Sequence, residues 1–448
     1  MWSNANPFLK VLMLSLWLTG TLLNLSAQSD ELNLEKYWKY RGRFLGNGTE
    51  ENPGFISVGM GPGKSMPMSG HHPERSCRDD WWMQNSGCTL SDGKGKLKWG
   101  DGTIHMGYYL ATLATHYALI SREGGDTRSI NYELDMALEA VIRLDTVAET
   151  VFGLPPRRNG FFVRDDVPQS FYLAQDGKTL RFPGHECVHS NFSCGEMQIT
   201  GGDFVSQDQV IHLLFGLAFA VELVPDEAKD FRGNSLKEKA IEIVHTMVNY
   251  LSEENWRIRD PLGNPAPNRW GGDVVGFSWM LSKAGAELTG RSENAYQSGK
   301  SRLFGSRVWD LLILSFGQQR DDNQAMALEL AAITAQWPMA RMSRRAEDAS
   351  MEVFALAQSV FHGQSPVAPV TREGIQVILN SAPDTGPCFN TPGCEAGPGW
   401  KGGNRWIKPL YSEQGNPYNV YYNWNGLDYM LLYNLYHLVY LKDIPYEN

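Results

Sequence analysis

The chain has 448 residues, of which 42% are hydrophobic and 20% charged, and its formal net charge is −10. This composition excludes an intrinsically disordered protein, and an acidic chain without a basic patch argues against a nucleic-acid partner. No internal apolar run reaches the roughly 20 residues that cross a bilayer, so we expect no membrane span in the folded part. The sequence leaves the oligomeric state open.

The N-terminal segment, residues 1–27, has the pattern of a secretory signal peptide. Lys10 is followed by an apolar stretch over residues 11–25 and then by the small residues Ser26 and Ala27. A positive charge, an apolar stretch and a small-residue exit are typical of a cleaved export signal. An uncleaved anchor is the weaker alternative, because the stretch is shorter than the roughly 20 residues of a membrane span. We therefore expect a secreted or periplasmic protein.

The six cysteines form three close pairs in Gly- and Pro-rich sequence. The pairs are Cys77/Cys88, Cys187/Cys194 and Cys388/Cys394. In an oxidising compartment, nearest-neighbour disulfides are the simplest hypothesis, although the sequence cannot choose among the connectivities. His185 and His189 flank Cys187, so a zinc site is the weaker alternative. We predict no cofactor and no metal.

From Asp101 onward the chain alternates between two kinds of predicted helix. Helices of the first kind are apolar on most faces and follow a polar cluster; they cover residues 104–120, 210–224, 274–288, 325–335 and 429–441. Helices of the second kind are amphipathic and cover residues 131–149, 236–251 and 351–361. A helix that is hydrophobic all round is buried on both sides, whereas an amphipathic helix keeps one wet face. The pattern therefore predicts buried inner helices covered by outer ones.

Two regions lack this helical pattern. Residues 28–100 are predicted to be a mostly irregular N-terminal arm that precedes a helical domain over residues 101–448. Residues 363–423 are a second irregular region rich in Gly and Pro. Brief period-two alternation at residues 179–182 and 375–379 predicts small hairpins within the loops.

Acidic residues stand where the buried helices begin. They are Asp101, Asp203, Asp208, Asp273, Asp321, Asp322 and Asp428. Glycoside hydrolysis uses one protonated carboxyl group and one ionised partner, so two of these residues are candidates for catalysis. Asp208 and Asp273 are the preferred pair, because each lies beside aromatic or amide residues suited to sugar hydroxyls. For each residue alone, helix capping is the alternative.

Histidines and tyrosines form a second candidate set. His105 lies one turn into a buried helix with Tyr108 and Tyr109 on its face, and His212 follows Asp208 by four residues. Elimination at a uronate needs a base for the C5 proton and an acid for the leaving oxygen, roles that His and Tyr can fill. Cations or amides available for the uronate carboxylate are Arg269, Asn191 and Arg164. The alternative for each histidine is a hydrogen-bonded core residue.

Trp270 and Trp424 immediately precede two of the buried helices. An indole ring stacks on the apolar face of a sugar while its N–H reaches a hydroxyl. We predict that both side chains bind substrate, together with Arg269, Asp101, Asp428 and Asn191. Packing of a lid over the helices is the alternative for the tryptophans.

In its organisation the chain resembles the toroidal carbohydrate-active enzymes, a group that includes unsaturated glucuronyl hydrolases and several polysaccharide lyases. The resemblance covers about residues 100–442 and rests on Trp-Gly-Asp-Gly at 99–102, Ser-Gln-Asp-Gln at 206–209 and Trp-Asn-Gly-Leu-Asp at 424–428. It implies an all-α, (α/α)6-like toroid of inner and outer helices, with long disulfide-stapled loops at one rim. Toroids also occur in prenyltransferases and epimerases, so the fold does not fix the function.

We therefore expect a secreted enzyme that cleaves glycosidic bonds of a poly- or oligosaccharide by paired acids. Elimination by a His/Tyr pair, as in a polysaccharide lyase or a sugar dehydratase, is the first alternative. A non-catalytic glycan-binding protein and a structural envelope protein are the alternatives from other classes.

Overall fold

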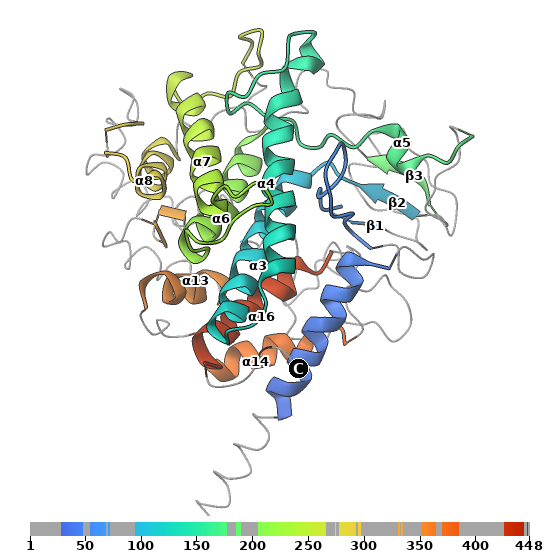
Figure 1. Cartoon of the computed structure of the whole chain (residues 1–448), viewed down its shortest axis with the longest axis vertical. Helices are drawn as coiled ribbons and strands as arrows, with labels where there is room; N and C mark the ends of the chain where they lie inside the picture. The colour runs from blue at the N-terminus through green and yellow to red at the C-terminus, as the bar shows by residue number, and fades with distance from the viewer. Residues whose placement is uncertain are drawn as a thin grey trace, which may run out of the picture.

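The fold is taken from a computed structural model of the chain (Figure 1). It describes residues 28–47, 54–68, 70–71, 95–176, 185–189, 205–265, 274, 277–292, 294–296, 330–331, 333–334, 352–363, 370–384, 425–442 and 446. Over these residues the chain is mostly helical, as the sequence predicts. The predicted signal peptide lies outside them.

The helices carry most of the structure, and a small sheet lies to one side of them (Figure 1). The helices are α3 (Gly102–Arg122), α4 (Arg128–Ala148), η1 (Glu149–Phe152), α5 (Gln169–Tyr172), α6 (Gln207–Leu223), α7 (Leu236–Glu253), α8 (Ser278–Thr289), α13 (Glu352–His362), α14 (Arg372–Ser381), α16 (Leu427–Tyr440) and an N-terminal helix over residues 28–45. The strands are β1 (Gly70–His71), β2 (Gly95–Lys98) and β3 (His185–His189). β2 lies between the other two strands, antiparallel to β1 and parallel to β3.

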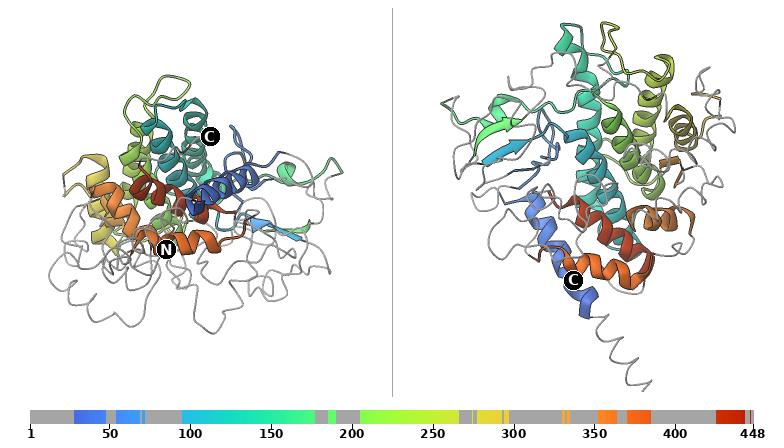
Figure 2. Two further views of the ribbon diagram at one scale, coloured as in Figure 1. Left: turned by 90° about the horizontal axis from the view of Figure 1, so that it is seen from below. Right: turned by 180° about the vertical axis from the view of Figure 1, so that it is seen from behind.

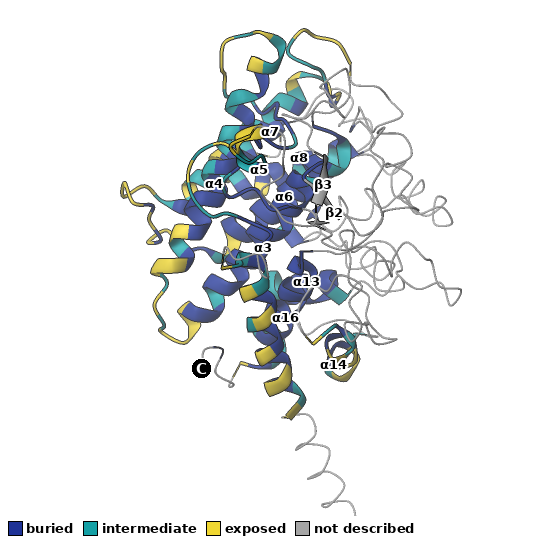
Figure 3. Cartoon of the chain, turned by 90° about the vertical axis from the view of Figure 1, so that its right-hand side faces the viewer, coloured by how far each residue is buried: buried dark blue, intermediate teal, exposed yellow. Residues whose placement is uncertain are grey.

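The long predicted helices are confirmed. The apolar segments form α3, α6 and α16, and the amphipathic segments form α4, α7 and α13. α8 begins later than predicted, because the backbone N–H of Val274 bonds to the carbonyl of Trp256 at 2.9 Å. Of the segment 325–335, residues 330, 331, 333 and 334 are helical, and the others lie outside the described residues. α3, α6 and α16 are buried along nearly their whole length (Figure 3).

α3 and α6 run parallel and touch through glycines. A Cβ atom at Gly107 would lie 2.0 Å from the carbonyl oxygen of His212, and one at Gly216 would lie 2.1 Å from that of Gly107. Both glycines are therefore needed for the two backbones to meet. This contact fixes the register of the two helices, with their N-terminal ends at the same level.

α16 packs against α3 in the same direction. Asn425 bonds to His105 near the start of both helices, Asn434 donates to the carbonyl of Thr112 at 3.2 Å, and the C-terminal ends meet where Arg122 approaches His437. α3 thus lies between α6 and α16, and all three helices begin at one end of the molecule.

The N-terminal helix (residues 28–45) corrects one expectation, since an irregular arm was predicted over residues 28–100. It runs antiparallel to α3 and α16: Tyr37 bonds to His116 at 2.8 Å, and Tyr40 stacks on Tyr429 with ring centroids 4.3 Å apart. Leu34, Tyr37, Tyr40 and Phe44 are buried at helical spacing. The Pro- and Gly-rich sequence that suggested a loop begins only after this helix.

The predicted hairpin at residues 375–379 is wrong, because this segment belongs to α14. The Thr371 hydroxyl accepts the N–H of Gly374 at 3.1 Å and so caps the helix. Ile375, Ile378 and Leu379 form its buried face at a helical spacing. Five alternating residues were too few to distinguish the two periods.

A buried ion pair joins the N-terminal helix to α4. The Arg41 guanidinium donates to Glu133, and the hydroxyl of Tyr109 on α3 donates to the other oxygen of Glu133 at 2.7 Å. Burial, followed by the charge of Glu133, raises the pKa of Tyr109 well above its usual value. Three segments therefore meet at one carboxylate.

α4 and α7 cover the inner helices from outside (Figure 2). On the facing sides of these two helices, Lys239 of α7 donates to Asp135 at 2.5 Å and to Glu139 at 2.7 Å of α4. Gly160, in the loop after η1, lies against Thr246 further along α7, so the two outer helices run in the same direction. α4 follows α3 and α7 follows α6, and in each case the chain reverses direction between them, so both outer helices run antiparallel to the inner helices.

Replacing Gly216 with Ala tests the glycine contact. We expect the free energy of unfolding to fall by about 2 kcal/mol, because the new Cβ overlaps the Gly107 carbonyl. The matched control is Gly42→Ala in the N-terminal helix, where a Cβ meets nothing within 4 Å. The control should gain about 0.5–1 kcal/mol from helix propensity. Equal effects of the two substitutions in urea denaturation would contradict the contact.

Removing the carboxylate charge of Glu133 tests the ion pair. Glu133→Gln leaves the Arg41 charge buried without its partner, so we expect unfolding free energy to fall by about 3 kcal/mol. The double variant Arg41→Met/Glu133→Leu removes both charges and should recover most of the loss. A double variant as unstable as Glu133→Gln would show that apolar packing around the pair matters more than its charge.

Candidate functional site

The N-terminal ends of α3, α6 and α16 come together around a group of polar side chains, here called the helix-start cluster. It consists of His105, Tyr108, Arg164, Ser206, Asp208, His212 and Asn425. Arg164 connects the beginnings of two helices: its guanidinium lies 3.5 Å from the carbonyl of Gly100, just before α3, and 3.3 Å from the hydroxyl of Ser206, just before α6. Arg164 thus joins the starts of α3 and α6, and the contact of Asn425 with His105 joins the start of α16 to that of α3.

His105 is held in one protonation form by Asn425. The Asn425 amide nitrogen donates to the carbonyl of Met68 and to Nδ1 of His105, both at 3.0 Å, while its oxygen accepts the N–H of Leu427 at 3.2 Å. These partners fix the orientation of the amide. Since an amide nitrogen only donates, Nδ1 of His105 is an acceptor, and the neutral ring carries its proton on Nε2.

His212 is held in the opposite form. Its Nδ1 lies 2.7 Å from the carbonyl oxygen of Asp208, one turn earlier in α6. Because a carbonyl only accepts, Nδ1 carries the proton and Nε2 carries the lone pair of the neutral ring.

Tyr108 lies between the two histidines. Its ring makes edge-to-face contacts with His212, at 5.5 Å between centroids, and with His105, at 6.3 Å. All three side chains are buried, with exposed fractions of 1% for each histidine and 2% for Tyr108. One potential proton acceptor and two potential proton donors therefore share a buried contact.

Two of the three described acids at the helix starts accept hydrogen bonds from local backbone. Asp208 accepts a hydrogen bond from Ser206 and another, at 3.0 Å, from the N–H of Gln209. Asp428 accepts the N–H of Tyr429 at 2.8 Å and is buried. Asp101 is the N-cap residue of α3, but its side chain makes no capping bond. Asp208 therefore belongs to the cluster, and Asp428 lies in the first turn of the neighbouring α16.

Tyr109, predicted to be catalytic, is engaged elsewhere. Its hydroxyl donates to Glu133 in the buried ion pair, on the side of α3 that faces α4 and the N-terminal helix. Tyr108, at the other helical spacing from His105, contacts the two histidines instead. Both tyrosines lie on the same helix face as His105, three and four residues after it. Only their contacts with neighbouring helices distinguish them.

Several predicted site residues lie outside the described residues or have side chains that are not described. These are Asp203, Asp273, Asp321, Asp322, Trp270, Trp424, Arg269, Asn191, Cys77, Cys88, Cys187, Cys194, Cys388 and Cys394, with Cys187 in strand β3. Asn425 belongs to a motif noted in the sequence, but no functional role was predicted for it. A polar residue just before an apolar helix was the available signal.

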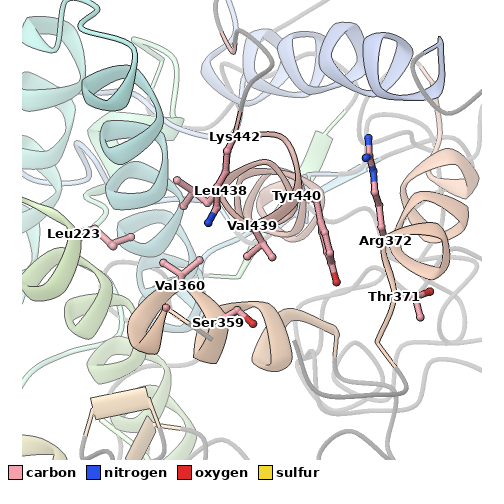
Figure 4. A pocket seen from close by; sticks show the side chains of 10 residues that line it. Leu223, Ser359, Val360, Thr371, Arg372, Leu438, Val439, Tyr440 and Lys442 are labelled. Atoms are coloured by element: carbon pink, nitrogen blue, oxygen red, sulfur yellow. The ribbon is translucent and has the colours of Figure 1, made fainter. Parts of the chain in front are cut away.

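A cavity of about 620 Å³ lies at the opposite ends of these helices (Figure 4). Its walls come from the C-terminal parts of α6, α13 and α16 and the start of α14. Two of its polar groups have structural partners: Arg372 donates to Asp30 at 2.6 Å, and Ser359 donates to the carbonyl of Ala355 at 2.9 Å. Tyr440 and Lys442 also line the cavity, and no residue of the helix-start cluster does.

Among the described residues, no group of three His, Cys, Asp or Glu side chains is arranged to hold a metal ion. No helix within the described ranges combines the length and apolar character needed to cross a bilayer. No protein-family model, no curated protein and no solved structure matches the chain. The functional argument therefore comes from the geometry of the helix-start cluster.

The proton positions on the two histidines can be measured directly. In ¹⁵N-histidine NMR spectra, we expect His105 to be protonated on Nε2 and His212 on Nδ1, with assignments from His105→Gln and His212→Gln. Asn425→Asp replaces the donor with an acceptor and should move the His105 proton to Nδ1. A wild-type His105 protonated on Nδ1 would contradict the assigned hydrogen bond.

Proposed function

We propose that the chain is an exported carbohydrate-active enzyme that cleaves a uronate-containing poly- or oligosaccharide by elimination. The observation that carries the proposal is the pair of histidines with opposite proton positions on either side of Tyr108. Elimination needs one base and one acid in the same site, and the hydrogen bonds assign a lone pair to His212 Nε2 and a proton to His105 Nε2. The sequence alone slightly favoured paired acids, but the described geometry favours the His/Tyr alternative.

In this proposal His212 Nε2 removes the proton at C5 of the uronate. The electron pair left on C5 forms the C4–C5 double bond, and the bond from C4 to the glycosidic oxygen breaks. The Tyr108 hydroxyl or His105 Nε2–H donates a proton to the leaving oxygen. Arg164 supplies positive charge for the carboxylate, whose negative charge grows as the C5 proton leaves.

An (α/α) toroid is the architecture that fits this proposal. In its support, α16, α3 and α6 lie side by side and parallel, while the N-terminal helix, α4 and α7 run antiparallel outside them. A toroid extends this alternation until the ring closes. Substrate would then bind at the end where the inner helices begin.

Hydrolysis by paired acids is the second candidate. Asp208 lies within the cluster, and the hypothesis needs a second carboxylate roughly 5–10 Å from it. Asp273 fills this role in the sequence prediction. Export is supported by the pattern of residues 1–27 and by the three close cysteine pairs.

A panel of polysaccharides tests the reaction. We expect the purified protein to release new reducing ends from at least one of pectate, alginate, glucuronan, hyaluronan or chondroitin, together with ultraviolet absorbance from the unsaturated uronate. It should not act on starch. Reducing ends without this absorbance would favour paired-acid hydrolysis, and binding without any product would favour a glycan-binding protein.

Substitution of His212 tests the assigned base. His212→Gln keeps a side-chain amide able to donate a hydrogen bond but removes the basic nitrogen, so kcat should fall by about 10²–10⁴-fold. The control is His245→Gln on the outer helix α7, where His245 bonds to Tyr296 at 2.8 Å. A His212→Gln protein with unchanged melting temperature and unchanged kcat would reject His212 as the base.

A further inference from the structure

The first turns of α3 and α6 contain polar atoms that are buried and unpaired. The Thr103 hydroxyl and both polar atoms of the Gln209 amide have no hydrogen-bond partner, and both residues have an exposed fraction of 0%. Buried polar groups in native proteins are nearly always paired. Each unpaired one costs about 1–3 kcal/mol, so these two residues need an explanation.

The register of the helices places Thr103 and Gln209 on the facing sides of α3 and α6. Gly107 of α3 lies against His212 and Gly216 of α6. Thr103 is four residues before Gly107, and Gln209 is seven residues before Gly216, so each lies on the face that meets the other helix. Both are therefore at one level of the α3–α6 contact, one turn closer to the helix starts than His212.

Hydroxyl groups deeper in α3 do not share this feature. Thr112 and Thr115 each donate to the carbonyl four residues earlier, both at 2.8 Å. For Thr103 that position is Trp99, which precedes the helix and whose carbonyl accepts the N–H of Gly102. α8 differs from α3, since the hydroxyls of Ser278 in its first turn and of Ser282 one turn deeper are both buried and unpaired.

We propose that Gln209 and Thr103 bind two adjacent hydroxyl groups of the sugar ring processed by His212. A carboxamide presents a donor and an acceptor side by side, which matches a pair of neighbouring hydroxyls. The Gln209 amide accepts from one hydroxyl and donates to the other, and Thr103 supplies a third polar atom. Gln209 reaches the helix starts by rotating its flexible side chain. Both are substrate-binding residues, and the assignment rests on the function proposed above.

The test combines stability with kinetics. Gln209→Met removes the unpaired amide at nearly constant volume, so the ligand-free protein should melt at a higher temperature. The same substitution removes sugar contacts, so kcat/KM on the uronate polymer cleaved in the panel should fall at least about 10-fold. Thr103→Val should behave in the same way with a smaller loss.

Gln376→Met is the matched control. Gln376 is buried like Gln209, but its amide donates to Asp30 at 2.7 Å. This substitution should lower the melting temperature and leave kcat/KM unchanged. A higher melting temperature for Gln209→Met and a lower one for Gln376→Met would distinguish an amide that binds substrate from an amide that stabilises the fold.

Two results with Gln209→Met would overturn the inference while the proposed function stands. One is a higher melting temperature with unchanged kcat/KM, and the other is a lower melting temperature like that of Gln376→Met. A wild-type protein that cleaves no polymer of the panel would instead reject the proposed function, and the inference with it.

Discussion

The contact between α3 and α6 at Gly107 and Gly216 is the constraint on which the rest of the structure depends. With no Cβ atoms between them, two parallel helices approach backbone to backbone, and a shift along either helix would bring a larger side chain into the contact. The register then decides which side chains meet at the N-terminal ends. Arg164 can reach both helix starts, and Tyr108 can contact His212, only because this register is fixed.

The N-terminal helix holds the first and last parts of the described chain together. Asp30 accepts hydrogen bonds from Gln376 of α14 and Tyr436 of α16, both at 2.7 Å. Lys36 donates to backbone carbonyls at the end of α14, where a cation also complements the helix dipole. Burial lowers the pKa of Lys36, so these contacts are made at some desolvation cost. These contacts join α14 and α16 to the N-terminal helix.

Helix positions were the most predictable part of the fold. Long apolar or amphipathic segments such as residues 104–120 and 236–251 carry a period that only a helix satisfies, and both form helices. Short signals failed: the alternation at residues 375–379 lies in α14, and the helix over residues 28–45 was not predicted because the many Pro and Gly residues after it favour a loop. The sequence of a short segment does not show which distant residues pack against it, and those contacts determine its secondary structure.

The candidate site was predictable in its residue types but not in its chemistry. The sequence identified His105, His212 and Asp208, and the structure brings them together near the helix starts. It did not distinguish Tyr108 from Tyr109, since Glu133 lies on another helix. Proton positions on the histidines depend on Asn425 and on a backbone carbonyl. Gln209 could not be recognised, because an unpaired amide is visible only in three dimensions.

A crystal structure with a bound uronate oligosaccharide tests the location of the site most directly. If the starts of α3, α6 and α16 form the substrate site, sugar density will lie there, with a C5 carbon within reach of His212 Nε2. Sugar bound instead in the cavity beside Tyr440 and Thr371, at the opposite helix ends, would contradict this assignment.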